Sequence, residues 1–246
     1  MVDDIDEDDD TISPEEELIK LISLMEESED MSLKGEIAES LGKIGGEMSE
    51  ATRTQVFEAI VKAIGPDLRD TERGEIGFIT GLGHLGDRRA TSLLINWLEY
   101  LVHLRNGRMP DGIRGWNFYF AISSLGQIGD GEAVAPILHA YAEQQGRFID
   151  LRKERNENDK RDRSFLKASD RMMEKNRGVA KEALVRIGED GRDRLSELSD
   201  GFYTDKFSEI EDPEFTHEEY EEHRNRQNNL IRELIRDVLD SIESHP

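Results

Sequence analysis

The sequence predicts an all-α fold: an α-solenoid of about four stacked helix pairs, with a capping helix at each end. The main observation is a short motif that occurs four times, as SLGKIG, GLGHLGD, SLGQIGD and ALVRIG, with its aligned leucine at Leu41, Leu82, Leu125 and Leu184. The copies are 41, 43 and 59 residues apart, and each stands between two apolar stretches of helical periodicity. Self-similarity at a spacing of roughly 20 to 50 residues is typical of stacked units that cannot bury their apolar faces alone.

The composition excludes several classes of protein. The chain holds 55 acidic and 32 basic side chains, for a net charge of −23, so duplex DNA and anionic membranes would be repelled. Cysteine is absent, which rules out disulfides, thiolate metal sites and cysteine nucleophiles. No apolar run reaches the roughly 18 to 20 residues of a membrane span. We therefore expect a cytoplasmic protein, and its excess of arginine over lysine in an acidic chain resembles the composition of proteins from halophilic microbes.

The N-terminal segment is strongly acidic. Residues 1–17 hold ten acidic and no basic side chains, which is typical of a solvated tail. We assign residues 1–13 to an acidic disordered tail and residues 14–246 to one solenoid domain. Alternatively, the acidic arm mimics nucleic acid or docks on a basic partner. Ser13, Pro14 and Glu16 form a helix start with a capping box, so we expect a first helix that ends near Glu27.

The first two units each consist of a helix, a glycine turn and a second helix. The first unit covers about residues 32–64 and turns at Gly45-Gly46. The second unit starts near residue 71, turns at Gly86 and continues in a helix over about 88–104. That second helix places four side chains inward, namely Leu94, Trp97, Leu98 and Leu101.

The third unit is the clearest copy. A glycine-rich loop over 106–115 precedes a helix over 116–125, and a turn at 129–131 leads into a second helix over 133–145. The glycine after the aligned leucine allows neighbouring helices to approach closely. The second glycine of the motif can take the left-handed conformation that ends a helix. The aspartates that follow it, Asp87 and Asp130, can cap the next helix.

Residues 147–177 form an irregular insertion before the fourth copy. They hold 11 basic and 7 acidic side chains, a net charge of +4, whereas the rest of the chain sums to −27. Because they offer too few apolar positions for a buried unit, we expect a charged helical extension with a loop and ion pairs at i, i+4 spacing. Alternatively, the insertion is a contact arm for an acidic partner. The fourth unit follows over about 179–198, and a long helix over 217–243, apolar mainly in its second half, caps the array.

Residues 125–138, which contain LGQIGD and then AVAPIL, resemble the HEAT-like repeats of the phycobilisome-lyase type. In that family the first helix ends in Ala-Leu-Gly-x-Ile-Gly-Asp and the second begins with Ala-Val-x-x-Leu. Residues 82–94 fit nearly as well, and the resemblance covers roughly residues 36–200. It implies HEAT-like helix pairs that serve as a binding surface. The arginine often found early in the family's first helix has no consistent counterpart, since the corresponding residues are Lys34, Glu75, Phe118 and Arg177.

The motifs that suggest catalysis have simpler explanations. GLGHLG at 81–86 matches the dinucleotide-binding pattern G-x-G-x-x-G, but the equivalent SLGKIG and SLGQIG show that it arises within the repeat. No strand alternates with helix to form a parallel sheet. The six histidines are scattered, and His217 and His223 lack the spacing of a zinc-binding H-E-x-x-H helix. We therefore expect a protein that is not an enzyme, with no catalytic residues, no metal and no cofactor.

Two candidate surfaces for a partner protein remain. The first is a polar and aromatic strip on the second helices, formed by Asn96, Tyr100, His103, His139 and Glu143. The second is the insertion with its basic residues Arg152, Lys153, Arg155, Lys160, Arg161 and Arg163. The predicted function is a non-catalytic protein–protein interaction scaffold or adaptor. Two alternatives stay open: a phycobilin-lyase-like enzyme or chaperone, which the resemblance implies, and an acidic protein that mimics nucleic acid to sequester a basic factor.

Overall fold

The computed structural model describes residues 12–66, 75–103, 113–158, 163–199 and 217–244, and these ranges contain α-helices, short 3-10 helices and no strand. The α-helices are α1 (Pro14–Glu27), α2 (Met31–Gly46), α3 (Glu50–Ile64), α4 (Glu75–Leu85), α5 (Thr91–His103), α6 (Ile113–Ile128), α7 (Val134–Asn158), α8 (Arg163–Ile187), α9 (Glu189–Ser199) and α10 (His217–Ser244). The 3-10 helices are η2 (Arg88–Ala90) and η3 (Gly131–Ala133). The predicted all-α class is confirmed, and α1 starts with the predicted capping box.

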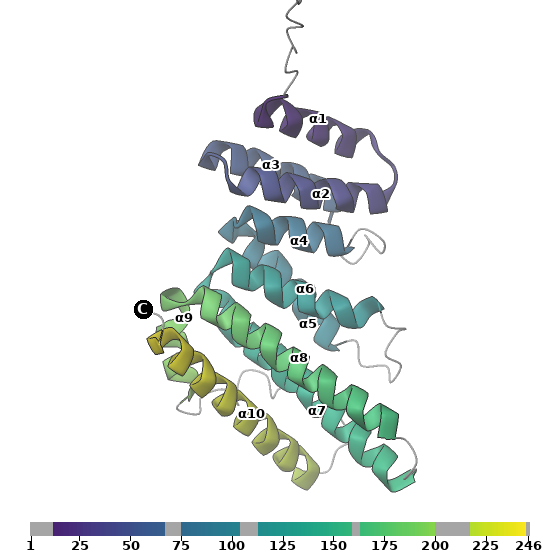
Figure 1. Cartoon of the computed structure of the whole chain (residues 1–246), viewed down its shortest axis with the longest axis vertical. Helices are drawn as coiled ribbons and strands as arrows, with labels where there is room; N and C mark the ends of the chain where they lie inside the picture. The colour runs from purple at the N-terminus through teal and green to yellow at the C-terminus, as the bar shows by residue number, and fades with distance from the viewer. Residues whose placement is uncertain (1–11, 67–74, 104–112, 159–162, 200–216, 245–246) are drawn as a thin grey trace, which may run out of the picture.

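The helices form two rows that follow the length of the array (Figure 1). In the first row α2, α4, α6 and α8 each pack on the next, and in the second row α7 lies between α5 and α9. At one end α1 packs on α2 and α3, and at the other end α10 packs on α7, α8 and α9. The predicted solenoid with a capping helix at each end is therefore confirmed. The number of repeats stays a prediction.

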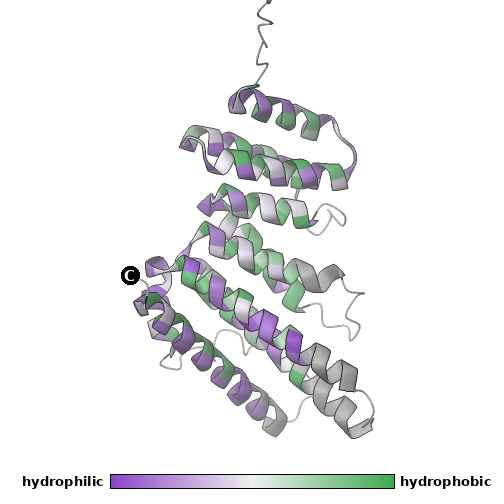
Figure 2. Cartoon of the chain, in the orientation of Figure 1, coloured by the Kyte–Doolittle hydropathy of each residue, from purple (hydrophilic) through white to green (hydrophobic). Residues whose placement is uncertain are grey.

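A continuous apolar core extends from α1 to α10. The aligned leucines of the motif copies are fully buried, and they are Leu41, Leu82, Leu125 and Leu184. The inward side chains predicted for α5 are buried as well. Apolar residues gather where the helices face one another, as Figure 2 shows. Since each buried leucine contributes about 1.5 to 3 kcal/mol through its removal from water, the units stabilise one another across these contacts.

The motif glycines set the distance between helices of the first row. A Cβ atom added to Gly42 of α2 would collide with the carbonyl group of Gly81 in α4, and one added to Gly81 would collide with the carbonyl group of Ala38. The backbones of α2 and α4 therefore touch, which only glycine permits. The contact between α6 and α8 follows the same rule more loosely, because a Cβ on Gly126 of α6 would meet Ala183 of α8. The predicted role of the glycine after the leucine is confirmed.

The turns within the units follow the predicted chemistry with one exception. The second glycine of the motif has a positive φ in three copies, at Gly86 (67°), Gly129 (72°) and Gly188 (56°). The carboxylates of Asp87 and Asp130 then accept hydrogen bonds from the backbone N–H groups of Arg89 and Glu132, which caps η2 and η3. Gly45 differs because α2 continues through it to Gly46.

Side chains at the turns also connect different units. The connecting pairs are Arg89 with Thr54 (3.1 Å), Thr91 with Asp130 (2.9 Å) and Arg88 with Asp190. These contacts join α3, η2, α5 and the beginning of α9 along one edge of the array. These polar contacts between units come from the turns, whereas α2 and α4 pack through apolar side chains and glycine.

The region predicted as an insertion belongs to two long helices. α7 continues to Asn158 and α8 already begins at Arg163, so the expected helical extension is confirmed, and residues 179–187 of the fourth unit continue α8 instead of starting a new helix. The charged residues form regular helix here because α7 and α8 pack on each other and need no buried unit of their own. We name residues 147–177 the basic hairpin; its far end extends beyond α5 and α6 (Figure 1).

A part of the range 106–115, which was predicted as a loop, is helical. α6 begins at Ile113, so the last three residues of that range are helical. Residues 104–112 lie outside the described part of the chain. The glycines at 112 and 115 favour a loop in the sequence-based prediction. A glycine near the first turn of a helix is nevertheless tolerated once the rest of the helix is packed.

Candidate interaction surfaces

The strip expected on the second helices is open to solvent on α5. Asn96 is exposed, and Tyr100 is half-buried, with its ring centroid 5.2 Å from that of Trp97. Trp97 itself is buried, so its predicted place in the core is confirmed. His103 ends α5, and its side chain lies outside the described part of the structure. The described open part of the strip therefore consists of Asn96 and Tyr100.

On α7 the strip is less open, and it contacts α10 at Glu143. His139 is 7% exposed, so the expectation that it lies off the apolar stripe is wrong. The Glu143 carboxylate accepts a hydrogen bond from the Gln227 amide of α10 at 2.6 Å. The strip is therefore not one continuous surface. The sequence pattern did not indicate this contact, because the polar first half of α10 meets a polar residue here instead of an apolar stripe.

The candidate basic residues of the insertion lie toward the far end of the basic hairpin. Arg152, Lys153 and Arg155 belong to α7, and Arg163 begins α8. The side chains of these four residues lie outside the described part of the structure, as do Lys160 and Arg161 altogether. Because α7 and α8 run side by side (Figure 1), the hairpin brings the helical members of this set to one end of the molecule.

The base of the basic hairpin is anchored to α6 and to itself. The Tyr119 hydroxyl of α6 contacts the sulfur of Met172 at 3.9 Å, and the Lys175 ammonium lies 4.7 Å above the centroid of the Tyr119 ring. Burial raises the pKa of Tyr119 to about 12, so the phenol stays neutral. The Gln145 amide of α7 donates a hydrogen bond to the backbone carbonyl of Met173 at 2.7 Å. The hairpin therefore leaves the array in a fixed direction.

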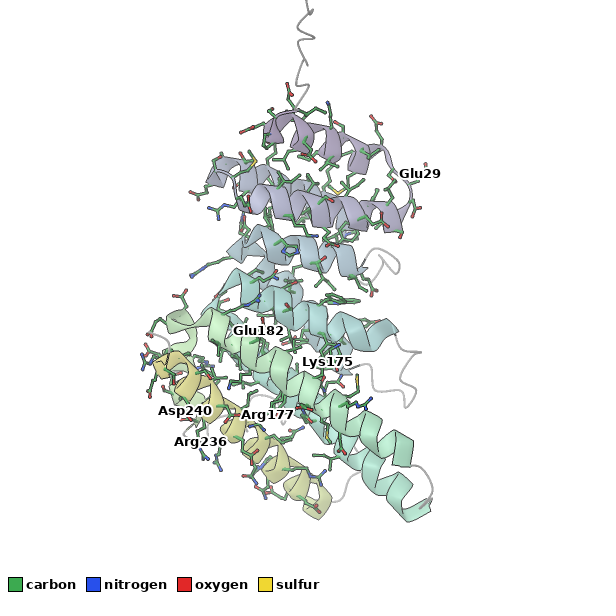
Figure 3. All side chains as sticks on the ribbon, in the orientation of Figure 1. Glu29, Lys175, Arg177, Glu182, Arg236 and Asp240 are labelled. Carbon is green, nitrogen blue, oxygen red and sulfur yellow. The ribbon has the colours of Figure 1, made fainter. Side chains whose placement is uncertain are left out.

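Arg177 joins α8 to the C-terminal helix. Its guanidinium forms ion pairs with Asp237 at 2.5 Å and Glu233 at 3.7 Å, both on α10, and Figure 3 shows Arg177 on the side of α8 that faces α10. The hydrogen bond from Arg177 lowers the pKa of Asp237. Burial raises the pKa of the nearby Tyr141. The sequence marked Arg177 only as an aligned position, because its partners lie in a distant helix whose register is not visible in the repeat.

A groove of about 500 Å³ opens beside this joint, between α8, the start of α9 and the end of α10. Its lining consists of Gly178, Lys181, Glu182, Val185, Gly188, Glu189, Ser241 and Ile242. Its charged side chains carry both signs, with Lys181 beside Glu182 and Glu189.

The described residues offer no arrangement typical of metal or nucleotide chemistry. Within the described ranges, no three histidine, aspartate or glutamate side chains come together as metal ligands. The GLGHLG segment forms the end of α4 and its turn, where Gly81 packs on α2 and Gly83 on Ser124 of α6. These glycines serve helix packing, as the repeat interpretation predicts. Among the helices that the structure describes, none has both the length and the apolar character of a membrane span.

Comparison with known families supports the repeat architecture. Residues 119–143 match the PBS lyase HEAT-like repeat. This stretch comprises the second part of α6, the turn at Gly129 and the first part of α7, and it contains the copy of the motif that resembles the repeat most closely. No curated protein and no solved structure matches the chain. With its paired helices and two stacked rows, the chain is an all-α array in which one helix–turn–helix segment matches a HEAT-like repeat.

Proposed function

We propose that the chain is a non-catalytic interaction scaffold, or adaptor, that contacts an acidic region of another protein through the basic hairpin. The observation that carries this proposal is a projecting pair of helices with a net charge of +4 on a chain with a net charge of −23. Arrays of stacked helix pairs present extended surfaces, and this use of such surfaces is common among solenoids.

The length of the hairpin helices supports a role in contact. α7 and α8 each have 25 residues, compared with 16 in α2 and α6. At a rise of about 1.5 Å per residue, the difference of nine residues extends each helix by roughly 13 Å. The added length carries charged residues and little apolar surface, so it contributes more to the solvent-facing surface than to the core.

The anchoring of the hairpin base supports a preformed contact surface. The Lys175 interaction with the Tyr119 ring and the hydrogen bond from Gln145 hold α8 against α6 and α7. An arm that is already ordered loses less conformational entropy on binding than a loop of the same sequence. Opposite charge on the partner would orient it toward the hairpin and increase the association rate.

The proposal can be tested by affinity purification from the native cell, followed by binding measurements with the captured protein. The variant Arg152→Glu/Lys153→Glu reverses charge on the hairpin, and Arg194→Glu/Arg236→Glu reverses the same number of exposed charges on α9 and α10. We expect the hairpin variant to weaken binding at least about tenfold, which corresponds to about 1.4 kcal/mol, and the control to change it little. Equal binding by both variants and the wild type would remove the hairpin from the interface.

A second candidate function follows from the matched family, whose description names a PBS lyase. If the chain handled a bilin chromophore, mixing it with free bilin would shift the absorption spectrum of the chromophore. An unchanged spectrum at micromolar protein would contradict this function and leave the scaffold proposal intact.

A further inference from the structure

The N-terminal end of the array has a surface unlike that of an ordinary capping helix. We infer that residues 12–33, which comprise α1 and the beginning of α2, dock a basic amphipathic helix of a partner protein. This surface lies at the opposite end of the array from α10 and is separate from the basic hairpin (Figure 1). The inference goes beyond the proposed function, because a scaffold that binds only through its hairpin would not need this surface.

The first observation is apolar exposure. The large hydrophobic side chains that are exposed in the described part of the chain all fall in this segment, and they are Ile12 (52% exposed), Ile19 (59%), Leu24 (46%) and Leu33 (38%). α1 attaches to the array through Leu18 and Met25, which are buried against α2 and α3. The outer side of a terminal helix faces water and is expected to be polar. Several exposed apolar side chains at such an end are typical of a contact surface.

The second observation is charge of a single sign. Residues 12–33 contain seven acidic side chains and one basic side chain, Lys20, and all eight are exposed. The acidic residues are Glu15, Glu16, Glu17, Glu26, Glu27, Glu29 and Asp30, of which Figure 3 labels Glu29, next to the connection from α1 to α2. Glu26 forms an ion pair with Lys62 of α3 at 2.7 Å. The surface therefore combines apolar side chains with a net negative charge.

These two observations together determine the kind of partner. A second copy of the chain would bring seven carboxylates against seven, which is electrostatically unfavourable. A basic segment would neutralise them instead. A helix suits the site, because the open end of a helical stack presents ridges and grooves onto which a further helix can pack. Ile19 and Leu24 lie on opposite flanks of α1. Apolar residues on one side of the docked helix would cover one of these flanks, and its lysines or arginines would face the glutamates.

The inference can be tested with a synthetic peptide. The probe is an 18-residue helix with leucines at i, i+3, i+4 and i+7 and lysines elsewhere, and the reference is a scrambled peptide of the same composition. Binding to the full chain is measured by fluorescence anisotropy at 0.15 M salt. We expect the patterned peptide to bind at least about tenfold more tightly, because only it can place its apolar side chains together on the surface.

Variants of the chain locate the binding site. Ile19→Ser/Leu24→Ser should weaken binding of the patterned peptide about tenfold, since partial burial of two such side chains accounts for an effect of that size. Glu17→Gln/Glu27→Gln should weaken it several-fold, whereas the matched control Glu58→Gln/Glu174→Gln, on α3 and α8, should not. All substituted residues are exposed, and circular dichroism verifies that each variant keeps the helical content of the wild type.

Three results would overturn the inference. Equal binding of the patterned and scrambled peptides would mean that only the acidic charge attracts them. Unchanged binding by Ile19→Ser/Leu24→Ser would place the peptide elsewhere. A concentration-dependent dimer that this variant disperses in sedimentation would show that a second copy covers the surface. The hairpin experiment above is unaffected by these outcomes, so failure here can be distinguished from failure of the scaffold proposal.

Discussion

The two ends of the array hold their helices together in different ways. Between α2 and α4 the backbones meet directly, because Gly42 and Gly81 have no side chains to separate them. Between α8 and α10, Arg177 spans the contact to reach Asp237 and Glu233. The first contact depends on shape and fails when an atom is added. The second adds partly exposed ion pairs to the buried apolar side chains of α10, so a part of its stability responds to pH and salt.

The largest expected effect tests the core that both ends share. Leu82→Ala in α4 removes a fully buried side chain, and we expect it to lower the free energy of unfolding by about 3 kcal/mol, because the cavity adds to the lost burial. Leu33→Ala, at an exposed leucine, should change it by less than about 0.5 kcal/mol. Urea unfolding followed by circular dichroism measures both. A similar loss in the two variants would contradict a core that depends on the aligned leucines.

The next effect concerns the close contact between backbones. Gly81→Ala should lower the free energy of unfolding by about 2 kcal/mol, because the new Cβ meets the carbonyl group of Ala38, which the α2 backbone holds in place. Gly178→Ala in α8 is the matched control, since a Cβ there meets nothing within 4 Å. It should stabilise the protein by up to about 1 kcal/mol through the better helix propensity of alanine. The opposite signs, measured by thermal unfolding, test the comparison directly.

A smaller effect is expected at the charged joint. Asp237→Asn should cost roughly 0.5 kcal/mol at neutral pH, because the ion pair with Arg177 is more than a third exposed and screened by solvent. The pKa of Asp237 is lowered in the folded state, so its contribution is fully present above the ordinary value of 3.8 and is lost as the pH falls below it. The difference between wild type and variant should therefore shrink in acid.

The control for this joint is Asp240→Asn, on the same helix and exposed. It should show no comparable change between neutral and acid pH, because in the described part of the chain Arg177 of α8 pairs with Glu233 and Asp237 and not with Asp240. Urea unfolding at several pH values measures both variants. A constant difference for Asp237→Asn from neutral pH into acid would mean that its charge does not hold α10.

The smallest expected effect is the response of the two ends to added salt, which should have opposite signs. Added salt screens the repulsion among the carboxylates of α1, and it also weakens the ion pairs between α8 and α10. We expect slower hydrogen exchange in α1 and faster exchange in the second half of α10. The free energy of local opening should change by a few tenths of a kcal/mol in each. A uniform change along the chain would argue against an electrostatic difference between the ends.

Much of the fold could be predicted because the repeat carries its own packing rules. The leucine, the glycine after it and the glycine–aspartate turn each have a local physical role, so Leu125, Gly126 and Asp130 indicate their structures without knowledge of distant contacts. The helical structure of residues 147–177 was also predicted. Its boundaries were not, because charged residues that favour helix do not show where a unit begins.

The candidate surfaces were harder to predict, since they depend on how distant elements pack. The burial of His139 and the contact of Glu143 with Gln227 of α10 depend on packing between distant helices, which no local pattern indicates. The same holds for Arg177, whose partners lie about 60 positions further along the chain. The exposed side of α1 could not be recognised either. Leu18 and Ile19 are adjacent apolar residues, and the sequence does not show that the first is buried and the second exposed.

The direct contact of α2 with α4 has a mechanical consequence. Where one backbone lies directly on another, no flexible side chain can accommodate a change in the angle between the helices. We therefore expect α2 and α4 to move together as one rigid body. Changes in angle are easier where longer side chains lie between two helices, as Arg177 does between α8 and α10. We therefore expect a load applied across the molecule to leave the angle between α2 and α4 unchanged and to be taken up where side chains lie between the helices.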